Sequence, residues 1–468
     1  MSFVFYDTET TGIDTAFDQI LQFGAIRTDA DLNEIDRFEI RCRLLPEIVP
    51  SPGAMLVTGV SAKQLTDPSL PSHYEMVCEI RAKLGSWSPS IFIGHNSLGF
   101  DEHLLRQALY KTLHSPYLTN TNGNGRSDSL KMLRAASVFA PDAVEIPVGS
   151  NGRKVFKLDQ LAPLNGFAHE NAHDAMADVE ATIHMCRLVA ERAPALWQNF
   201  VRLAHKPSAL DFALNEAAYC VTDFHYGQSY SRPVSPIGTN PDNGSEVLVF
   251  DLSVDPAELA QLDDEQLGKR LDKSPRPVRS IRANTAPVLN ELADAPEDIR
   301  SGWPEPEEVE ERAGLISADK ALRERLVATT LEKREPFPAA EYIEQRIYDG
   351  FPSWNDNQLM ERFHQADWPE RISILSRFED ERLKALARRL AYSEAPALMT
   401  DTDRRDQELE IAGRLVAAQD DVPWTTIAGA LAEAGNKLKE ADPETSVFIE
   451  EHIDLLKQRQ QWAVEVQG

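Results

Sequence analysis

The chain has 468 residues, which is too long for one ordinary domain and by length alone suggests about three. Its hydrophobic fraction of 42% and mean hydropathy of −0.37 are typical of a globular protein, and no run approaches the roughly 18–20 apolar residues of a membrane helix. The formal net charge of −27 excludes a general electrostatic attraction to polyanions.

No large part of the chain is basic. The regions 1–193, 194–345 and 346–468 carry formal net charges of −7, −11 and −9. Because the field of the whole chain repels polyanions, a nucleic acid could bind only through a local groove and a metal site. A nucleic-acid partner therefore needs support from specific motifs.

The cysteines and the N-terminus bear on the compartment. The four cysteines lie far apart and form no CxxC pair, which indicates free thiols in a reducing cytosol and neither disulfides nor a zinc site. The segment Met1-Ser2-Phe3-Val4 lacks basic residues and leads into a strand, so we expect no signal peptide. These features predict a cytoplasmic protein.

The first region, 1–193, reads as strands followed by alternating strands and helices. Its first three strands have short polar connections, which predicts an antiparallel meander. The later alternation predicts a mixed sheet flanked by helices. The predicted strands are 3–8, 20–28, 37–45 and 91–94, the helices are 72–86, 100–113, 128–139 and 173–193, and the loops are 119–127 and 142–154.

Two further regions differ in character and complete a prediction of three domains, 1–193, 194–345 and 346–468. Short β-prone segments separated by Pro, Gly and Asn predict a small β domain interrupted by helices, and strand signals vanish after about residue 346. Ser353 and Pro423 are predicted at helix starts. The β segments are 221–224, 247–252 and 278–281, an acidic helix start is 303–312, and the later helices are 354–365, 379–392, 402–418, 424–435 and 444–463.

Two carboxylates end the first predicted strand, in Phe5-Tyr6-Asp7-Thr8-Glu9. Strand side chains alternate between faces, so Asp7 and Glu9 point the same way. Adjacent carboxylates repel each other unless a cation neutralises them. The pair therefore predicts a site for a hard cation, Mg²⁺ or Mn²⁺.

Two later segments supply more of what such a site needs. Asp101 follows Gly94-His95-Asn96-Ser97-Leu98-Gly99-Phe100 at a loop-to-helix transition, from which it can reach a metal directly or through water. Asp178 would complete the ligands of Asp7 and Glu9. His173, five residues before Asp178, is of the residue type best suited to serve as general base for a water nucleophile.

Each feature also has an ordinary explanation. Asp-x-Glu arises by chance in acidic proteins, Asp101 alone reads as a helix cap, and His173 alone reads as a surface residue. Lys157 and Arg134, our candidates for phosphate contacts, could be plain surface charges. The order Asp-x-Glu, Asn-x₃-Phe-Asp, His-x₄-Asp within one domain-sized span is improbable by chance, which favours the functional interpretation.

These three segments resemble the Exo I, Exo II and Exo III motifs of the DEDDh exonuclease superfamily, over about residues 1–193. The resemblance implies an RNase-H-like fold and removal of nucleotides from a 3′ end. It implies two divalent ions, and it implies that His173 is the histidine of the subclass. The metal ligands that it implies are Asp7, Glu9, Asp101 and Asp178, and the residues expected to contact the substrate are Glu9, Lys157 and Arg134.

A narrower resemblance is to the bacterial exodeoxyribonuclease I family, and it spans nearly the whole chain. It implies a multidomain α+β protein: an RNase-H-like mixed-sheet exonuclease domain, a Src-homology-like β-barrel domain with helices, and an all-α C-terminal domain, with a groove for single-stranded DNA. Lys157 stands where the family has Arg, which keeps the charge but loses the bidentate fork. The segments that carry the resemblance are Ala25–Asp29, Pro52–Gly59, Asn171–Asp178, Ala286–Leu289 and Tyr348–Phe351.

The combined prediction is a Mg²⁺-dependent 3′→5′ exonuclease, with Mn²⁺ as a substitute, that releases 5′-mononucleotides from single-stranded DNA with a free 3′ end in repair and recombination. The resemblance adds a contact with single-stranded-DNA-binding protein, and we expect a monomer without a membrane partner. Two alternatives stay open. An RNA 3′-end exonuclease of the same superfamily is disfavoured by the long C-terminal half, and a non-catalytic nucleic-acid-binding scaffold by the intact set of four carboxylates and His173.

Overall fold

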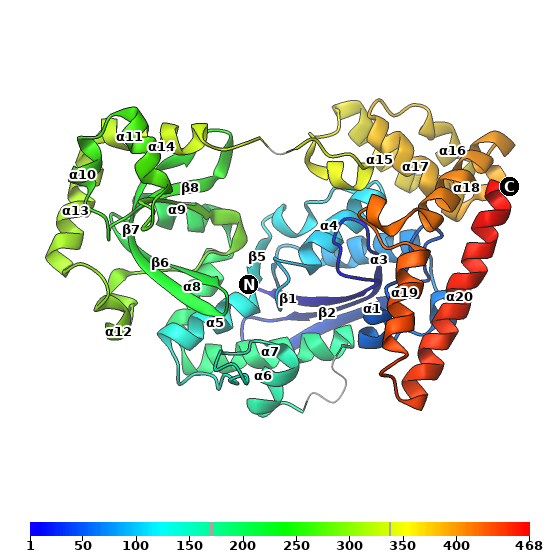
Figure 1. Cartoon of the computed structure of the whole chain (residues 1–468), viewed down its shortest axis with the longest axis horizontal. Helices are drawn as coiled ribbons and strands as arrows, with labels where there is room; N and C mark the ends of the chain where they lie inside the picture. The colour runs from blue at the N-terminus through cyan, green and yellow to red at the C-terminus, as the bar shows by residue number, and fades with distance from the viewer. Residues whose placement is uncertain (169–172, 337) are drawn as a thin grey trace.

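The computed structural model describes residues 1–168, 173–336 and 338–468, so Asn171 and Ala172 of the third motif lie outside the described residues. The chain forms a central part built on a mixed sheet, with a β domain on one side and a group of helices on the other (Figure 1). This arrangement confirms the predicted multidomain α+β class. Among the described helices, none is long and apolar enough to cross a membrane.

The central sheet has the order β3-β2-β1-β4-β5. Strands β1, β2 and β3 pair antiparallel, whereas β4 and β5 run parallel to β1, which confirms both the meander and the mixed sheet. Alternate residues of β1 enter two different cores, Phe3 and Phe5 on one face and Val4 and Tyr6 on the other. The sheet is therefore covered on both faces, by α7 on the first and by α3 and α4 on the second.

The elements of this part begin and end close to most of the predicted ranges. They are β1 (Phe3–Thr10), β2 (Ile20–Thr28), β3 (Glu34–Arg41), α1 (Pro52–Thr58), α2 (Ala62–Leu65), α3 (His73–Ser86), β4 (Ile91–Gly94), α4 (Asp101–Lys111), η1 (Leu118–Asn120), β5 (Gly125–Asp128), α5 (Ser129–Phe139), α6 (Leu158–Leu164), α7 (Ala175–Arg192), α8 (Pro194–Leu203) and α9 (Lys206–Asn215).

The loop predicted at 119–127 is wrong at its end, because Gly125–Asp128 forms the edge strand β5. All four residues, Gly-Arg-Ser-Asp, are buried, yet none is an apolar strand former. The strand is held by parallel pairing with β4, from Ile91 with Gly125 to Gly94 with Asp128, a long-range contact that composition does not reveal.

The β domain is an antiparallel sheet of order β10-β6-β7-β8-β9. Its longest strand, β7, was missed because Pro233, Pro236 and Gly238 read as turn residues. The register shifts between Pro236 and Gly238, as expected for a bulge that accommodates such residues. The elements are β6 (Tyr219–His225), β7 (Gln228–Asn240), β8 (Asn243–Asp251), α10 (Pro256–Ala260), α11 (Asp264–Asp272), β9 (Val278–Arg282), η2 (Ala283–Thr285), β10 (Leu289–Asn290), η3 (Leu292–Asp294), α12 (Glu297–Arg300), α13 (Pro306–Ala318) and α14 (Lys320–Glu332).

The C-terminal part consists of helices in its described residues, as predicted. Ser353 caps α15 by accepting a hydrogen bond from the backbone N of Asp356, but the helix start predicted at Pro423 is wrong, because α19 is capped by Thr426. The elements are η4 (Ile343–Tyr348), α15 (Trp354–Gln365), α16 (Trp368–Leu375), α17 (Glu381–Glu394), η5 (Pro396–Leu398), α18 (Asp401–Val416), η6 (Gln419–Asp421), α19 (Ile427–Lys437) and α20 (Pro443–Gln467).

A buried carboxylate, Glu102 in α4, holds the arginine that connects the central part to the β domain. It accepts hydrogen bonds from Tyr6 Oη (3.2 Å), and it forms ion pairs with Arg106 (2.8 Å) and Arg126 (2.7 Å). Burial opposes its charge, but these two guanidinium groups outweigh burial and lower the pKa of Glu102. Arg126 also donates to the backbone oxygen of Asn284 in the β domain (2.9 Å). Arg126, in the edge strand β5 of the first sheet, therefore contacts both the central part and the β domain.

Candidate functional site

Glycine at position 24 allows the main chain of α7 to reach the sheet beside Asp7. In the β1–β2 pairing, Gly24 lies opposite Asp7. A Cβ at this position would lie 3.0 Å from the backbone C of Ala175 and the backbone N of Met176, so only glycine permits this approach without a shift. The first turns of α7, which carry Asp178, therefore pack directly over the strand that carries Asp7.

Asp174 fixes the start of α7 at this place. Its side chain caps the helix by accepting hydrogen bonds from the backbone N of Met176 (3.2 Å) and of Ala177 (3.3 Å). It also accepts from Gln22 Nε2 (2.9 Å) and forms an ion pair with Arg41 (2.8 Å) on the neighbouring strands. The cap thus joins the helix to β2 and β3.

The structure brings Asp7, Glu9 and Asp178 together. One carboxylate oxygen of each lies within 4.8 Å of the other two, at the end of β1. Burial, followed by the charges of Asp101, Asp178 and Glu9, raises the pKa of Asp7 well above its usual value. Burial, followed by the charge of Asp178, raises the pKa of Glu9 from 4.5 to about 9. Three crowded carboxylates, Glu9 buried and Asp7 and Asp178 half-buried, fit a divalent cation, which would remove the repulsion that raises these pKa values.

Asp101 stands beside this group and not within it. It is the first residue of α4, and its Oδ1 accepts a hydrogen bond from Thr8 Oγ1 at 2.6 Å. Burial raises the pKa of Asp101 to about 6, and the Thr8 hydroxyl group works in the opposite direction. Since the charge of Asp101 raises the pKa of both Asp7 and Glu9, all four carboxylates share one electrostatic site.

Asp128 braces the loop that leads to Asp101. It caps α5 by accepting a hydrogen bond from the backbone N of Leu130 (2.9 Å), and it also accepts from the backbone N of Asn96 (3.0 Å) and of Leu98 (3.1 Å). The carboxylate of Asp128 therefore holds the loop through two of its backbone N–H groups. Asn96 itself is exposed and adopts a positive φ of 63°.

His173 lies two residues before the start of α7 and is exposed. Its φ of 68° is in the left-handed region, which is uncommon for residues other than glycine. Its ring makes no hydrogen bond to a residue within the described ranges. The imidazole is therefore open to solvent at the beginning of the helix that carries Asp178.

Comparisons with known proteins agree with this geometry along the whole chain. The family model described as "Exonuclease" matches residues 4–186, "Exonuclease I SH3-like domain" matches 215–329, and "Exonuclease I C-terminal domain" matches 341–466. Exodeoxyribonuclease I of Escherichia coli (strain K12) is 30% identical over 408 residues, which cover 82% of this chain and 84% of the relative. The chain belongs to the exodeoxyribonuclease I family.

Solved structures of exonuclease I share the fold throughout. The enzyme from Methylocaldum szegediense has a TM-score of 0.81 at 26% identity and covers 100% of both chains. E. coli exonuclease I in complex with a dA16 oligonucleotide has a TM-score of 0.82 at 24% identity and covers 99% of each chain. As a member of the exodeoxyribonuclease I family, the chain is an exonuclease, and its β domain is the SH3-like domain of that family.

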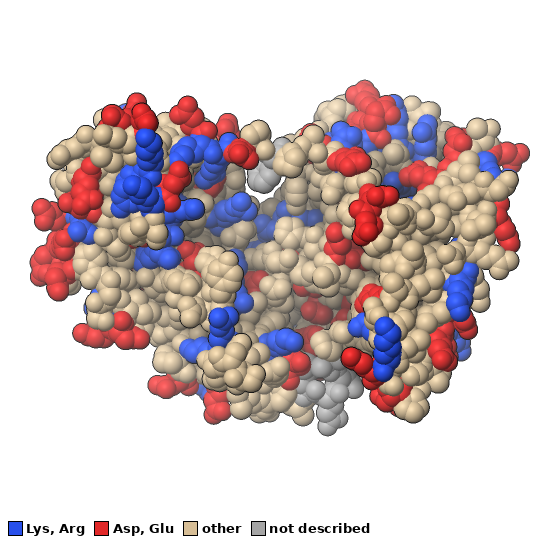
Figure 2. Space-filling view, in the orientation of Figure 1, with Lys and Arg blue, Asp and Glu red and all other residues tan. Residues whose placement is uncertain are grey.

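Arg134 and Lys157 lie near the boundary between the exonuclease and SH3-like domains. The guanidinium of Arg134 in α5 is 5.8 Å from the ring of Phe156 and 6.0 Å from that of Phe224 in β6, so it lies between the two domains. Lys157, next to Phe156, is exposed. Figure 2 shows Lys and Arg side chains along the hollow beside the SH3-like domain, while Asp and Glu side chains crowd the side of that domain that faces away from the hollow. Basic side chains therefore gather locally beside the SH3-like domain although the chain as a whole is acidic.

Sequence reasoning missed several residues that position this exonuclease site. Thr8 orients Asp101, Gly24 admits α7, and Asp174 anchors it. Asp174 had a usable signal, because an Asp immediately before a predicted helix is a common cap. Thr8 and Gly24 had none, since their partners are distant in sequence.

Proposed function

We propose that this exonuclease removes nucleotides from the 3′ end of single-stranded DNA, releases 5′-mononucleotides and acts in DNA repair and recombination. The observation that carries the proposal is the convergence of Asp7, Glu9 and Asp178 at the edge of an exonuclease domain. The E. coli relative, whose solved structures hold dA16 and dT13 oligonucleotides, supports the choice of substrate.

The proposed cofactor is Mg²⁺, two ions per site, with Mn²⁺ as a substitute. Asp7, Glu9 and Asp178 would hold one ion, and Asp7 together with Asp101 would hold the second. Oxygen-only ligands suit hard cations, and one solved structure of the E. coli relative is described as a zinc-ion-bound complex with single-stranded DNA. Divalent ions in such a site supply an activated water and stabilise the leaving 3′ oxygen.

The remaining side chains handle the proton and the substrate. His173, exposed at the start of α7, would accept the proton of the attacking water. Thr8 holds Asp101 in position. Arg134 and Lys157 would contact phosphates of the DNA, with Arg134 fixed between two aromatic rings.

Partners and organisation follow from the same proposal. We propose that the protein acts as a monomer in the cytoplasm, where its four cysteines, all free in the structure, stay reduced. Single-stranded-DNA-binding protein is a proposed partner, since one similar solved structure is described as SSB/Exonuclease I in complex with an inhibitor. The proposed domain divisions are 1–193, 194–345 and 346–468.

The test is an assay on labelled single-stranded DNA, double-stranded DNA and RNA oligonucleotides, with Mg²⁺ or with EDTA. We expect mononucleotide release from single-stranded DNA that stops in EDTA. Asp7→Asn should lower the rate on the order of 10³-fold, or about 4 kcal/mol of transition-state stabilisation, with little change in folding. Asp31→Asn, at an exposed position of the same domain, is the matched control and should leave the rate unchanged.

Three results would argue against the proposal. Faster release from RNA than from DNA of the same sequence would favour an RNA 3′-end exonuclease. Binding of DNA without release of any mononucleotide would favour a non-catalytic scaffold. Unchanged turnover in Asp7→Asn would reject the metal ligands proposed here.

A further inference from the structure

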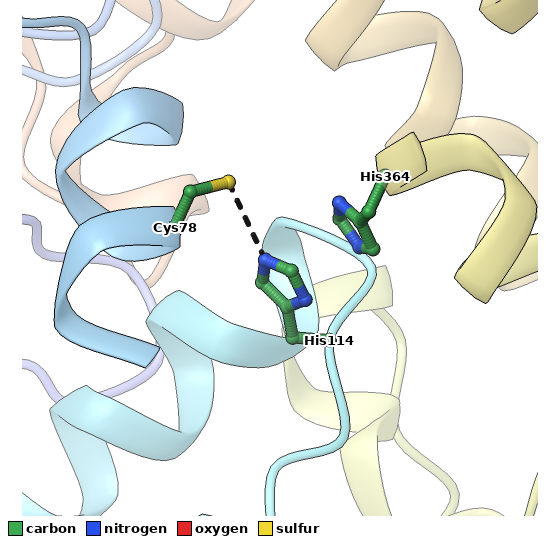
Figure 3. A group of neighbouring side chains, drawn as sticks. All are labelled: Cys78, His114 and His364. Atoms are coloured by element: carbon green, nitrogen blue, oxygen red, sulfur yellow. Dashed lines mark hydrogen bonds between the residues drawn. The ribbon is translucent and has the colours of Figure 1, made fainter. Parts of the chain in front are cut away.

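A second cluster of metal-binding side chains lies far from the carboxylates, where the C-terminal helices pack on the exonuclease domain. Cys78 comes from α3, His114 from the loop after α4, and His364 from α15 (Figure 3). One ligand atom of each lies within 4.8 Å of the other two. The surrounding core joins both domains, with Tyr74 and Leu113 on one side and Phe363 on the other.

The spacing of Cys78 and His114 already fits a tetrahedral metal. The sulfur of Cys78 is 3.5 Å from Nε2 of His114, and the ring nitrogen faces the sulfur in Figure 3. A tetrahedral Zn²⁺ ion with bonds of about 2.3 Å to sulfur and about 2.0–2.1 Å to nitrogen separates these two ligand atoms by about 3.5 Å. The distance between these two ligand atoms is therefore already that of a zinc site.

The hydrogen bonds of His364 prepare it as a third ligand. Its Nε2 lies 3.0 Å from the backbone oxygen of Leu113, so Nε2 carries the proton and donates it. Its Nδ1 is then an acceptor and receives a hydrogen bond from Tyr74 Oη at 2.9 Å. A ring whose outer N–H donates to a carbonyl while its other nitrogen faces inward is the arrangement found around histidines that bind metals.

The charge states of the cluster favour binding near neutral pH. Burial lowers the pKa of His114 to about 2 and that of His364 to about 4, so both rings are neutral and can act as ligands. Burial raises the pKa of the Cys78 thiol, whereas its hydrogen bond with Tyr74 and the charge of Arg371 lower it. Arg371 and Arg81 both oppose an added cation, and the thiolate formed on binding offsets one positive charge.

We propose that Cys78, His114 and His364 bind one Zn²⁺ ion that joins the exonuclease domain to the C-terminal domain. On binding, the Cys78 thiol releases its proton to solvent, and the sulfur and two ring nitrogens each form a bond to zinc. The rings of His114 and His364, now stacked at 3.6 Å between centroids, separate, and Tyr74 Oη or a water fills the fourth position. This site was invisible in sequence because its ligands come from three distant segments without a CxxC pair.

The ligand types distinguish this site from the carboxylate centre. A thiolate with two imidazoles selects zinc and related transition metals, whereas carboxylate oxygens suit Mg²⁺. Zinc content alone would not decide between the two places, since carboxylates also bind zinc. The experiment must therefore report on a metal–sulfur bond.

Substitution of Co²⁺ for zinc provides that report, because a Co²⁺–thiolate bond gives a charge-transfer absorption that carboxylate and imidazole ligands do not. With excess Mg²⁺ present, we expect one equivalent of Co²⁺ to produce this band in the wild-type chain. The band should persist in Asp7→Asn, which disables the carboxylate centre, and disappear in Cys78→Ser. Absence of the band in the wild-type chain, or its survival in Cys78→Ser, would overturn the proposal.

A second measurement covers the case in which Cys78→Ser does not fold. His364→Gln keeps the sulfur and removes a half-buried ligand of the C-terminal domain. With Mg²⁺ held constant, added Zn²⁺ should raise the melting temperature of the wild-type chain more than that of His364→Gln, because zinc at the carboxylate centre would stabilise both chains equally. An equal shift in both chains, or no shift in either, would reject the interdomain site while leaving the proposed nuclease function intact.

Discussion

At the scale of single residues, the carboxylate centre is set by groups that are not themselves candidates for metal binding. The hydroxyl group of Thr8 holds Asp101, and Asp174 holds the helix that carries Asp178. The same centre concentrates negative charge in a buried place, as the raised pKa values of Asp7 and Glu9 show. Both features lead to measurable consequences.

Without metal, the protein should lose stability as pH rises. The pKa of Glu9 is about 9 in the folded chain and 4.5 in the unfolded chain. Between pH 4.5 and about pH 9 the folded state therefore binds more protons than the unfolded state. The free energy of unfolding should therefore fall across this window in EDTA, and stabilisation by Mg²⁺ should grow over the same range. Thermal unfolding at several pH values, with and without Mg²⁺, measures both effects.

Glu9→Gln is the matched variant for this pH dependence. It removes one titrating group while keeping the shape of the side chain, so the fall in stability with pH should become shallower. Identical pH slopes for the two proteins in EDTA would contradict the raised pKa of Glu9.

Loss of the Thr8 hydroxyl group should shift the acid limb of the activity profile. Thr8→Val keeps the shape of this buried side chain but removes the hydrogen bond that lowers the pKa of Asp101. We expect a further rise of that pKa, a higher Mg²⁺ requirement, and a loss of about 1–3 kcal/mol of stability. The pH profile of kcat/KM at fixed Mg²⁺ measures the shift. Thr8→Ser retains the hydroxyl group and should behave like the wild-type chain. Matching pH profiles for Thr8→Val and Thr8→Ser would disprove the role of the hydrogen bond from Thr8 to Asp101.

At the scale of elements, the sequence correctly predicted the strands and helices whose formation depends on a local periodic pattern. The paired carboxylates of β1 need only the two-residue period of a strand, and the helix of Asp178 needs only its own pattern. In contrast, β5 is a strand through its pairing with β4, and β7 contains two prolines that its bulged register tolerates. The formation of such strands depends on pairing with residues distant in the sequence, and a local periodic pattern carries no information about that pairing.

The same division applies to the candidate site. The four carboxylates and His173 could be selected from motif order, and the structure brings three of the carboxylates within 4.8 Å of one another. Gly24 could not be selected, because its importance lies in the 3.0 Å approach of α7, a helix some 150 residues away in the chain. Residues that perform chemistry were thus easier to find than residues that position them.

At the scale of the whole molecule, a buried charge cluster joins the C-terminal helices to one another where they meet the exonuclease domain. Glu344 in η4 forms ion pairs with Arg414 (2.7 Å) and Arg389 (2.8 Å). Gln107 of α4 donates to its backbone oxygen at 2.9 Å. Burial opposes the charge of Glu344, but the two arginines outweigh it and lower the pKa to about 2.

Glu344→Gln should destabilise the C-terminal domain by about 3–5 kcal/mol near neutral pH, because it leaves buried arginine charge without its partner. The folded pKa lies below the ordinary value of 4.5, so the stabilisation is present above that value and is lost as pH falls toward about 2. Urea unfolding of both chains at neutral and acidic pH should show a difference in midpoint that shrinks on acidification.

The control is Glu410→Gln, which removes a half-exposed partner of Arg389 and should cost at most about 1 kcal/mol. If Glu344→Gln unfolded at the same urea concentration as the wild-type chain at neutral pH, the buried cluster would not be what stabilises the C-terminal helices.

Glu102 limits how freely this nuclease domain could be exchanged during evolution. Glu102 directly follows Asp101 in the chain and accepts a hydrogen bond from Tyr6 of the central strand β1. It also forms an ion pair with Arg126, which donates a hydrogen bond to the main chain of the SH3-like domain. A substitute domain of the same fold would carry its carboxylates correctly only if it brought this glutamate and arginine along. Recombination between relatives should therefore preserve the helix that begins at Asp101, the strand of Arg126 and the SH3-like domain as one inherited unit, even though Arg126 and Asn284 are 158 residues apart.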